Sequence, residues 1–248
     1  MVQIETVQMI RNKYKILLII LVMALGNNAI AQDKIRKWGI GLSTGFASFS
    51  MKDLKEYQAE SHGNFTPEGK IVKSFPAYWM GSFHVSYIDS IKFFDLSVGR
   101  TSTGGRLSYS DYSGEYSHDL TVVMVYSAAS AGFRVGRIKK WNIFASAQVL
   151  AYSNLLKQRY REEIYDVYSD DYTIQYTSIN LALAPGFELH RHFGSHLVLR
   201  QQTSYEIHIP GKLFLKDDFD YELTNEAGDN VKVQAQGFRI KIGLVYLF

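Results

Sequence analysis

The chain has 248 residues, of which 46% are hydrophobic, 14% aromatic and 21% charged, and its formal net charge is +3. This composition excludes an intrinsically disordered chain, so small a charge excludes a surface built for nucleic acid, and the lack of cysteine excludes disulfides, thiolate metal sites and a lipidated cysteine. The slightly negative mean hydropathy excludes a bundle of transmembrane helices, but a membrane barrel stays possible because only alternate residues of its strands need be apolar.

The first element along the chain is an export signal. A basic stretch at 11–15 precedes an apolar run at 16–25, and this run of about ten residues is too short to cross a bilayer core of roughly 30 Å as a helix. An A-x-A motif follows; its two alanines and the first residue after it are Ala29, Ala31 and Gln32. We predict a signal peptide over 1–31, with Met9 as a second candidate for the start, and a single domain over 32–248.

Alternation of apolar and polar residues with period two recurs after the signal and predicts strands. Apart from a short helical stretch near Met51 to Tyr57, no helical period is convincing. The alternation is clearest at the end of the chain, where apolar residues from Phe238 to Phe248 fall on one face. Eight strands are expected, near 38–48, 75–88, 94–99, 123–135, 141–157, 179–189, 197–209 and 238–248.

The connections between these strands alternate in length. Three are short, at 88–91, 137–140 and 190–194. Four are long, polar and rich in tyrosine and serine, at 51–74, 104–118, 158–172 and 210–231. An up-and-down outer-membrane barrel has short periplasmic turns and long extracellular loops. The fold class predicted is therefore all-β, an eight-stranded antiparallel transmembrane β-barrel with both termini in the periplasm.

A soluble lipocalin-type barrel also has eight alternating strands, with its apolar face inward. The export signal, the loop asymmetry and the aromatic girdle expected from Trp38 and Trp141 favour the membrane version. The polar faces carry both signs of charge, which can pair inside a closed barrel. The charge network expected in the interior consists of Asp95, Arg134, Glu188, Arg200, Glu206, Arg239 and Lys241. With eight strands, side chains just fill the interior.

The chain ends in a pattern that outer-membrane barrels share. Leu244, Tyr246 and Phe248 are apolar or aromatic residues at alternate positions, ending in an aromatic, and they resemble the signal read by the barrel-assembly machinery. With the signal peptide and the eight strands, they make the mature chain similar to the small outer-membrane barrels that include PorT-type proteins of Bacteroidetes and OmpA/OmpX-like barrels. This resemblance implies a role beside a secretion complex.

Two groups of residues invite a catalytic or metal-binding interpretation. Ser204, Glu206 and His208 share a strand face, but the serine and histidine lie about 13 Å apart at roughly 3.4 Å per residue, beyond hydrogen-bond reach. His190, His192 and His196 could gather a metal in the third short turn, but we expect no carboxylate to lie close enough to complete the site. We therefore predict no catalytic residue, no metal and no cofactor, and keep a lipid-modifying enzyme as an alternative.

The long connections suggest a binding role. They concentrate tyrosine among serine and aspartate, for example at Tyr109, Tyr112 and Tyr116, and tyrosine with serine makes adaptable contact surfaces. Acidic clusters at 170–171 and 217–222 are candidates for Ca²⁺ or for divalent bridges to lipopolysaccharide, or are solvated loop charge. The leading hypothesis is a non-enzymatic barrel that binds a partner protein or an exterior ligand through its loops. Its expected partners are outer-membrane lipid, lipopolysaccharide, the assembly machinery and a larger outer-membrane complex; a narrow channel is a further alternative.

Overall fold

The computed structural model describes residues 37–63, 70–165 and 167–248. The predicted signal peptide, with Met9, Ala29, Ala31 and Gln32, lies outside the described residues, so its prediction is untested.

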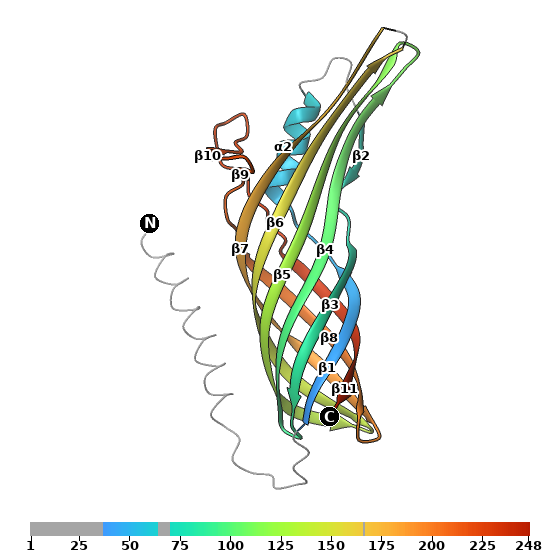
Figure 1. Ribbon diagram of the computed structural model, residues 1–248, viewed down its shortest axis with the longest axis vertical. Helices are drawn as coiled ribbons and strands as arrows, with labels where there is room; N and C mark the ends of the chain where they lie inside the picture. Colours follow the sequence, from blue (N-terminus) through green and yellow to red (C-terminus); the bar gives the residue numbers. More distant parts are fainter. Residues whose placement is uncertain (1–36, 64–69, 166) are drawn as a thin grey trace, which may run out of the picture. The chain divides into compact units, whose positions relative to one another are not determined.

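Eight strands form a closed antiparallel ring, which confirms the predicted eight-stranded barrel (Figure 1). Each strand pairs with its neighbour in the chain, and the pairing of the first with the last closes the ring. The strands are β1 (Lys37–Ala47), β3 (Tyr78–Ile88), β4 (Lys92–Ser110), β5 (Gly114–Ile138), β6 (Trp141–Ile164), β7 (Tyr168–Phe193), β8 (Leu197–Ile209) and β11 (Gly237–Leu247).

The alternation in the sequence becomes a division between lumen and exterior. Along β11, Phe238 is 61% exposed and its neighbour Arg239 is 1% exposed, and the same alternation continues to the end of the strand. Successive side chains of a strand point to opposite faces, so every strand of the ring has an apolar exterior face. The exposed apolar side chains form a belt around the barrel, with members such as Leu42, Leu96 and Ile179.

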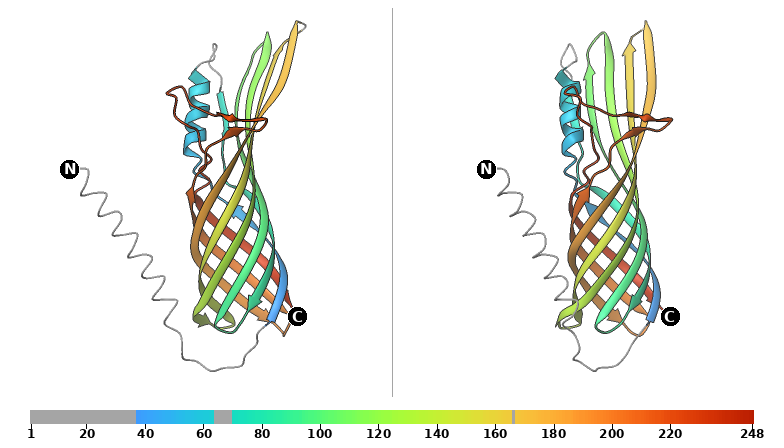
Figure 2. Two further views of the ribbon diagram at one scale, coloured as in Figure 1. Left: turned by 60° about the vertical axis from the view of Figure 1, so that its left-hand side comes forward. Right: turned by 90° about the vertical axis from the view of Figure 1, so that its left-hand side faces the viewer.

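The strands differ in length at one end of the ring only. The short connections, at 89–91, 139–140 and 194–196, all join strands at the other end. β4 to β7 have 19 to 26 residues, whereas β1, β3, β8 and β11 have 11 to 13. The four longer strands therefore continue past the ring as a projecting sheet (Figure 2).

The predictions of long loops at 104–118 and 158–172 are thus wrong in detail. Most of 104–118 and of 158–172 is strand. β4 and β5 are joined by a tight turn at 111–113, and β6 reaches Ile164 while β7 begins at Tyr168. Outside the belt, polar side chains occupy both faces of a strand, so the alternation that identifies a strand is weak there.

The other two long connections fold over the open end of the ring. The first contains α2 (Lys52–Gly63), which extends the predicted helical stretch, and β2 (Lys70–Ser74), which pairs with β4. The second contains β9 (Phe214–Leu215) and β10 (Asp218–Glu222). In the described part of the chain, no helix has both the length and the hydropathy needed to cross a membrane.

The interior has three layers. At the end with the short turns lies a small apolar cluster that includes Phe93 and Phe144, and polar and charged side chains fill the centre. Above them, Leu54 of α2 and Val231 and Val233 of the second long connection join barrel residues in a larger apolar cluster. Apolar material therefore covers the polar centre at both ends.

Candidate functional site

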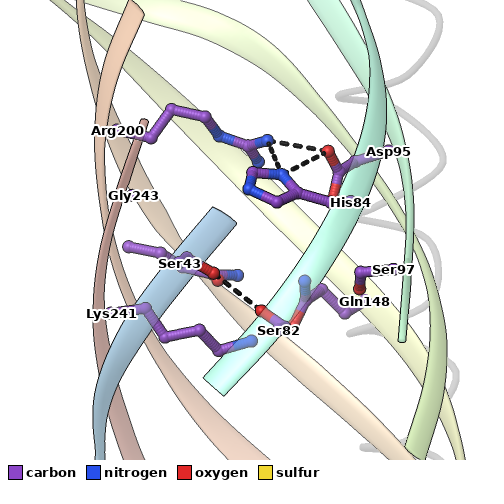
Figure 3. A pocket seen from close by; sticks show the side chains of 10 residues that line it. Ser43, Ser82, His84, Asp95, Ser97, Gln148, Arg200, Lys241 and Gly243 are labelled. Atoms are coloured by element: carbon purple, nitrogen blue, oxygen red, sulfur yellow. Dashed lines mark hydrogen bonds and ion pairs between the residues drawn. The ribbon is translucent and has the colours of Figure 1, made fainter. Parts of the chain in front are cut away.

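The centre of the barrel is organised around Arg200 of β8. Its guanidinium donates to Asp95 of β4 at 2.7 Å (Figure 3). It also donates to Glu188 of β7 at 2.8 Å. His84 of β3 lies 3.2 Å from the same Asp95 carboxylate, and His190 lies 2.9 Å from Glu188. All five side chains are buried, so this first cluster joins four strands across the lumen.

A second cluster lies around Glu206 of β8. Its Oε2 atom accepts from Arg239 at 2.9 Å and from the hydroxyl of Tyr152 at 2.8 Å, and lies 3.1 Å from Nε2 of His208. These groups are also buried. Glu206 and His208, at alternate positions of β8, thus contribute to a polar core, and the strand order brings Arg239 and Tyr152 to them from other strands.

Two of the cations predicted for this network pair with none of its carboxylates. Lys241 is buried, but its ammonium lies 5.5 Å from the Tyr126 ring, and no carboxylate pairs with it among the described residues. Arg134 is half-buried beside a β-bulge between β5 and β6 and joins neither cluster. Because the bulge falls next to the short turn, Arg134 lies at the rim of the lumen.

The buried charges balance. Six acidic or basic side chains are buried in the described chain, three cations and three carboxylates: Arg200, Arg239, Lys241, Asp95, Glu188 and Glu206. The polar centre leaves a cavity of only about 20 Å³, lined by residues that include His84, Arg200 and Lys241, which is room for about one water molecule. The site is therefore a packed polar core.

The residues considered for catalysis and metal binding do not form a site. Ser204 is buried and its hydroxyl has no hydrogen-bond partner in the described structure, while His208 is occupied by Glu206. The expectation that no carboxylate lies near the histidines considered for a metal is wrong, because Glu188 lies 2.9 Å from His190 inside the lumen. His196 is held elsewhere and bonds the backbone oxygen of Leu247 at 3.0 Å. Among the described residues, no cluster of three or more histidine, cysteine or acidic side chains is placed to hold a metal.

The projecting sheet offers a different kind of site. We define it as residues 103–110 of β4, 114–122 of β5, 156–164 of β6 and 168–176 of β7. Its inner face continues the lumen face of the barrel and its outer face continues the exterior belt. On the inner face, the register aligns His118, Tyr160 and Tyr172 in one row across three strands. Their rings stack, with centroids 4.2 Å and 4.9 Å apart.

The next row on the inner face combines tyrosine with acid. The register places Tyr109 opposite Tyr116, Tyr116 opposite Glu162, and Glu162 opposite Asp170. Like charges directly opposite one another destabilise a sheet. Neither Glu162 nor Asp170 makes an ion pair with another described residue.

The outer face of the same sheet carries paired charges. Arg106 binds Asp119 through two hydrogen bonds, and Arg159 binds Asp171 in the same way. Arg161 pairs with Glu163 at 2.8 Å. All arginines and lysines of the four projecting segments lie on this outer face, and the acidic pair at 170–171 is split between the two faces. The acidic stretch 217–222 is exposed up to Tyr221, and the half-buried Glu222 pairs with Lys212.

Burial changes the protonation of the inner face. His118 is 1% exposed, and burial lowers the pKa of its imidazole to about 4. Burial also raises the pKa of Tyr160. The ring stack is therefore uncharged at neutral pH. At the tip, hydrogen bonds from Ser113 and Tyr109 lower the pKa of the Asp111 carboxyl to about 2.

The aromatic residues predicted at the rim are exposed or half-buried. Trp38 is 56% exposed and packs edge-on against Tyr87, and Trp141 lies under the guanidinium of Arg191. The predicted assembly residues Leu244, Tyr246 and Phe248 are all more than half exposed. Sequence reasoning missed a second aromatic group, Tyr78 and Trp79, at the opposite end of the belt.

Comparisons with known proteins give distant likenesses. No family model matches the sequence, and no curated protein matches it either. Among solved structures, Neisserial surface protein A is 12% identical with a TM-score of 0.34, over 88% of this chain and 100% of that one. The outer-membrane protease OmpT from Escherichia coli is 9% identical with a TM-score of 0.35, over 90% of this chain and 99% of that one. The barrel assignment therefore rests on the strand pairing of this chain.

Proposed function

We propose that this protein is a non-enzymatic outer-membrane barrel that binds a partner protein through its projecting sheet. The observation that carries the proposal is the projecting sheet itself: four strands continue past the apolar belt and end in a surface rich in tyrosine, serine and acid. Tyrosine-rich surfaces with small polar residues make adaptable protein contacts. Nothing in the barrel's packing requires strands of this length, because the ring closes with strands of 11 to 13 residues.

The proposal includes a membrane location. The apolar belt is flanked at both ends by exposed aromatic side chains, as expected for a barrel surrounded by outer-membrane lipid. Charged side chains first occupy the exterior of β6 at Lys157 and Arg159, where the projecting sheet begins. In this orientation the short turns and both chain ends are periplasmic, and the projecting sheet meets lipopolysaccharide and the cell exterior. Leu244, Tyr246 and Phe248 are the residues we propose for recognition by the assembly machinery.

The packed interior argues against the alternatives of a channel and of a lumenal enzyme. Apolar clusters lie at both ends of the polar centre, and the cavity between them has room for about one water molecule. Among the described residues, this cavity is too small to hold a substrate or a hydrated ion beside the buried groups. The role we propose, that of an accessory protein of a larger outer-membrane complex, needs no path into the lumen.

The test is a pull-down from native outer membranes in mild detergent, read by mass spectrometry. The intact barrel is compared with a trimmed variant in which 107–118 and 159–173 are each replaced by an Asn-Gly turn, at positions that face one another in the register. We expect a stoichiometric partner with the intact barrel that is lost from the trimmed one, while circular dichroism shows that both fold. Equal recovery of the partner with both proteins, or of no partner with either, contradicts the proposal.

A further inference from the structure

Most of one edge of the projecting sheet has no neighbour among the described residues. β7 pairs with β6 along its whole length, but its other edge meets β8 only from Leu181 and β9 only at Tyr176 and Thr177. The backbone of Lys216 donates to Gln175, the last contact of this edge. The segment from Tyr168 to Ile174, which we call the open edge, therefore presents unpaired backbone groups.

Sheet edges of this kind attract further strands, and proteins usually protect them with charged side chains, above all lysine, or with proline or a bulge. The open edge, Tyr-Ser-Asp-Asp-Tyr-Thr-Ile, has no lysine and no proline, and its register with β6 is continuous. Its two charges, Asp170 and Asp171, are both negative, so they repel acidic strands and can attract basic ones. An open edge beside pockets for alternate side chains is the arrangement that binds an extended peptide by strand addition.

The charges beside the open edge favour a peptide of opposite charge. A strand added there places alternate side chains on the inner face, next to Asp170 and Tyr172. On that face, the carboxylates of Glu162 and Asp170 oppose each other with no cation of the four projecting segments near them. A basic side chain added beside them relieves this repulsion, and the rings of Tyr168 and Tyr172, each about half exposed, are available for cation–π contact.

The same charges disfavour a second copy of this chain. Two open edges that paired with one another would bring Asp170 and Asp171 of one molecule next to those of the other, and like charges directly opposite destabilise a sheet. Charge complementarity thus favours an occupant of the opposite sign.

We propose that the open edge binds an extended peptide segment that carries lysine or arginine at alternate positions, as an added strand of the projecting sheet. The inference rests on the proposed function and names the chemistry of the partner. The peptide backbone pairs with Tyr168–Ile174, its basic side chains lie beside Asp170 and Glu162, and its other side chains lie over the ion pair of Asp171 with Arg159.

The test uses the full chain in detergent micelles and a fluorescein-labelled heptapeptide of alternating lysine and valine, followed by fluorescence anisotropy. The first comparison peptide has glutamate in place of lysine. The second keeps lysine but is N-methylated at its central amides, so it cannot pair along either edge. We expect binding of the first peptide that weakens with salt, and no measurable binding of the two comparison peptides. Equal binding of the N-methylated peptide overturns strand addition.

Two double variants locate the site. Glu162→Gln with Asp170→Asn removes the two inner-face charges, and Glu163→Gln with Asp171→Asn removes two charges from the outer face of the same strands. We expect the inner-face variant to weaken binding about ten-fold and the outer-face variant to change it less than about three-fold. Equal effects of the two variants overturn the proposed selection by charge.

Two outcomes separate this inference from the proposed function. If the pull-down returns a partner that needs the projecting sheet, but neither variant nor any basic peptide affects its binding, the proposed function stands and the open-edge site is wrong. If sedimentation shows a dimer that the trimmed variant cannot form, a second copy occupies the edge and the basic-peptide proposal is wrong.

Discussion

Arg200 is the side chain on which the largest number of lumenal contacts converge. It neutralises Asp95 and Glu188 at once, and it also donates to His84 and Ser86. A buried ion pair adds little net stability compared with apolar residues of the same size, but removing one partner leaves a buried charge uncompensated. Arg200 is therefore important because its removal would leave buried charges unpaired, and not because its ion pairs add net stability to the barrel.

Replacing Arg200 by methionine is expected to lower the free energy of unfolding by about 3–5 kcal/mol, because two carboxylates then stay buried without a cation. The measurement is urea unfolding of the barrel in micelles. Lys241→Met is the matched control, since Lys241 pairs with no carboxylate of the described chain, and its loss is expected to be smaller. A triple variant that also replaces Asp95 by leucine and Glu188 by methionine should recover most of the stability. A larger effect at Lys241 than at Arg200 contradicts this assignment.

His118 makes stability depend on pH. Its pKa in the folded protein is about 4, below the ordinary value of 6.5, so the unfolded chain binds the proton more tightly. The free energy of unfolding is therefore expected to fall as the pH drops from about 6.5 to about 4, by at most about 3 kcal/mol. Urea unfolding at several pH values measures the slope. The His118→Phe variant keeps the ring stack and cannot titrate, so the difference between the two proteins isolates this group from the lumenal histidines. Parallel pH profiles would contradict the prediction.

For single residues, the sequence could predict which face of its strand each side chain occupies. The alternation placed seven charged residues on lumen faces. Arg134 is half-buried, and the other six, Asp95, Glu188, Arg200, Glu206, Arg239 and Lys241, are buried. It could not say which of them meet, because partners across the lumen depend on the stagger between strands, which no single strand encodes. The contribution of Tyr152 to the second cluster was missed for the same reason, since an aromatic residue in a strand carries no sign of a polar partner.

Among the strands, the exterior face of β4 gives the sharpest test of the membrane belt. Phe94, Leu96 and Val98 are at least half exposed there, between Lys92 and Arg100. Leu96→Arg is expected to lower the stability of the barrel in lipid by about 2–4 kcal/mol, because the charge then faces hydrocarbon. Reversible unfolding in bilayer vesicles measures the effect.

Ser169→Arg is the control for that measurement. Ser169 is exposed and lies opposite Glu163 on the projecting sheet, so an arginine there stays in water beside an acid. A change within about 0.5 kcal/mol is expected. If the two substitutions cost the same, the belt does not face lipid.

The projecting sheet was the element least accessible to sequence reasoning. The segments 104–118 and 158–172 read as loops because serine, tyrosine and charged residues occupy both faces once the strands leave the belt. The tight turns were also hidden: Asp111 forms its turn through hydrogen bonds to Ser113 and Gly114, a signal that resembles loop composition as well as a hairpin. The positions of the three short turns, by contrast, could be predicted from the sequence.

The barrel with its two apolar closures leads to a prediction about conductance. We expect planar-bilayer recordings of the intact protein to show no discrete current steps, because the polar centre is packed and covered at both ends. Deleting α2, residues 52–63, removes part of the cover at one end only. The deletion is expected to leave the recordings flat, since the ion clusters and the cluster around Phe93 remain. Regular steps from the intact barrel would contradict this description of the lumen.

The pairing of β1 with β11 joins segments that are almost the whole described chain apart, for example Gly39 with Leu247. Forming contacts at such a separation is slow, because the loop-closure entropy must be lost before the contact is gained. A nascent chain that lacks β11 leaves β1 and β8 as two exposed edges, each ready to aggregate. The ring can close only after the last strand is available. Before closure the chain is most prone to aggregation through its exposed strand edges. A chaperone that binds the unclosed chain is therefore most useful in that period.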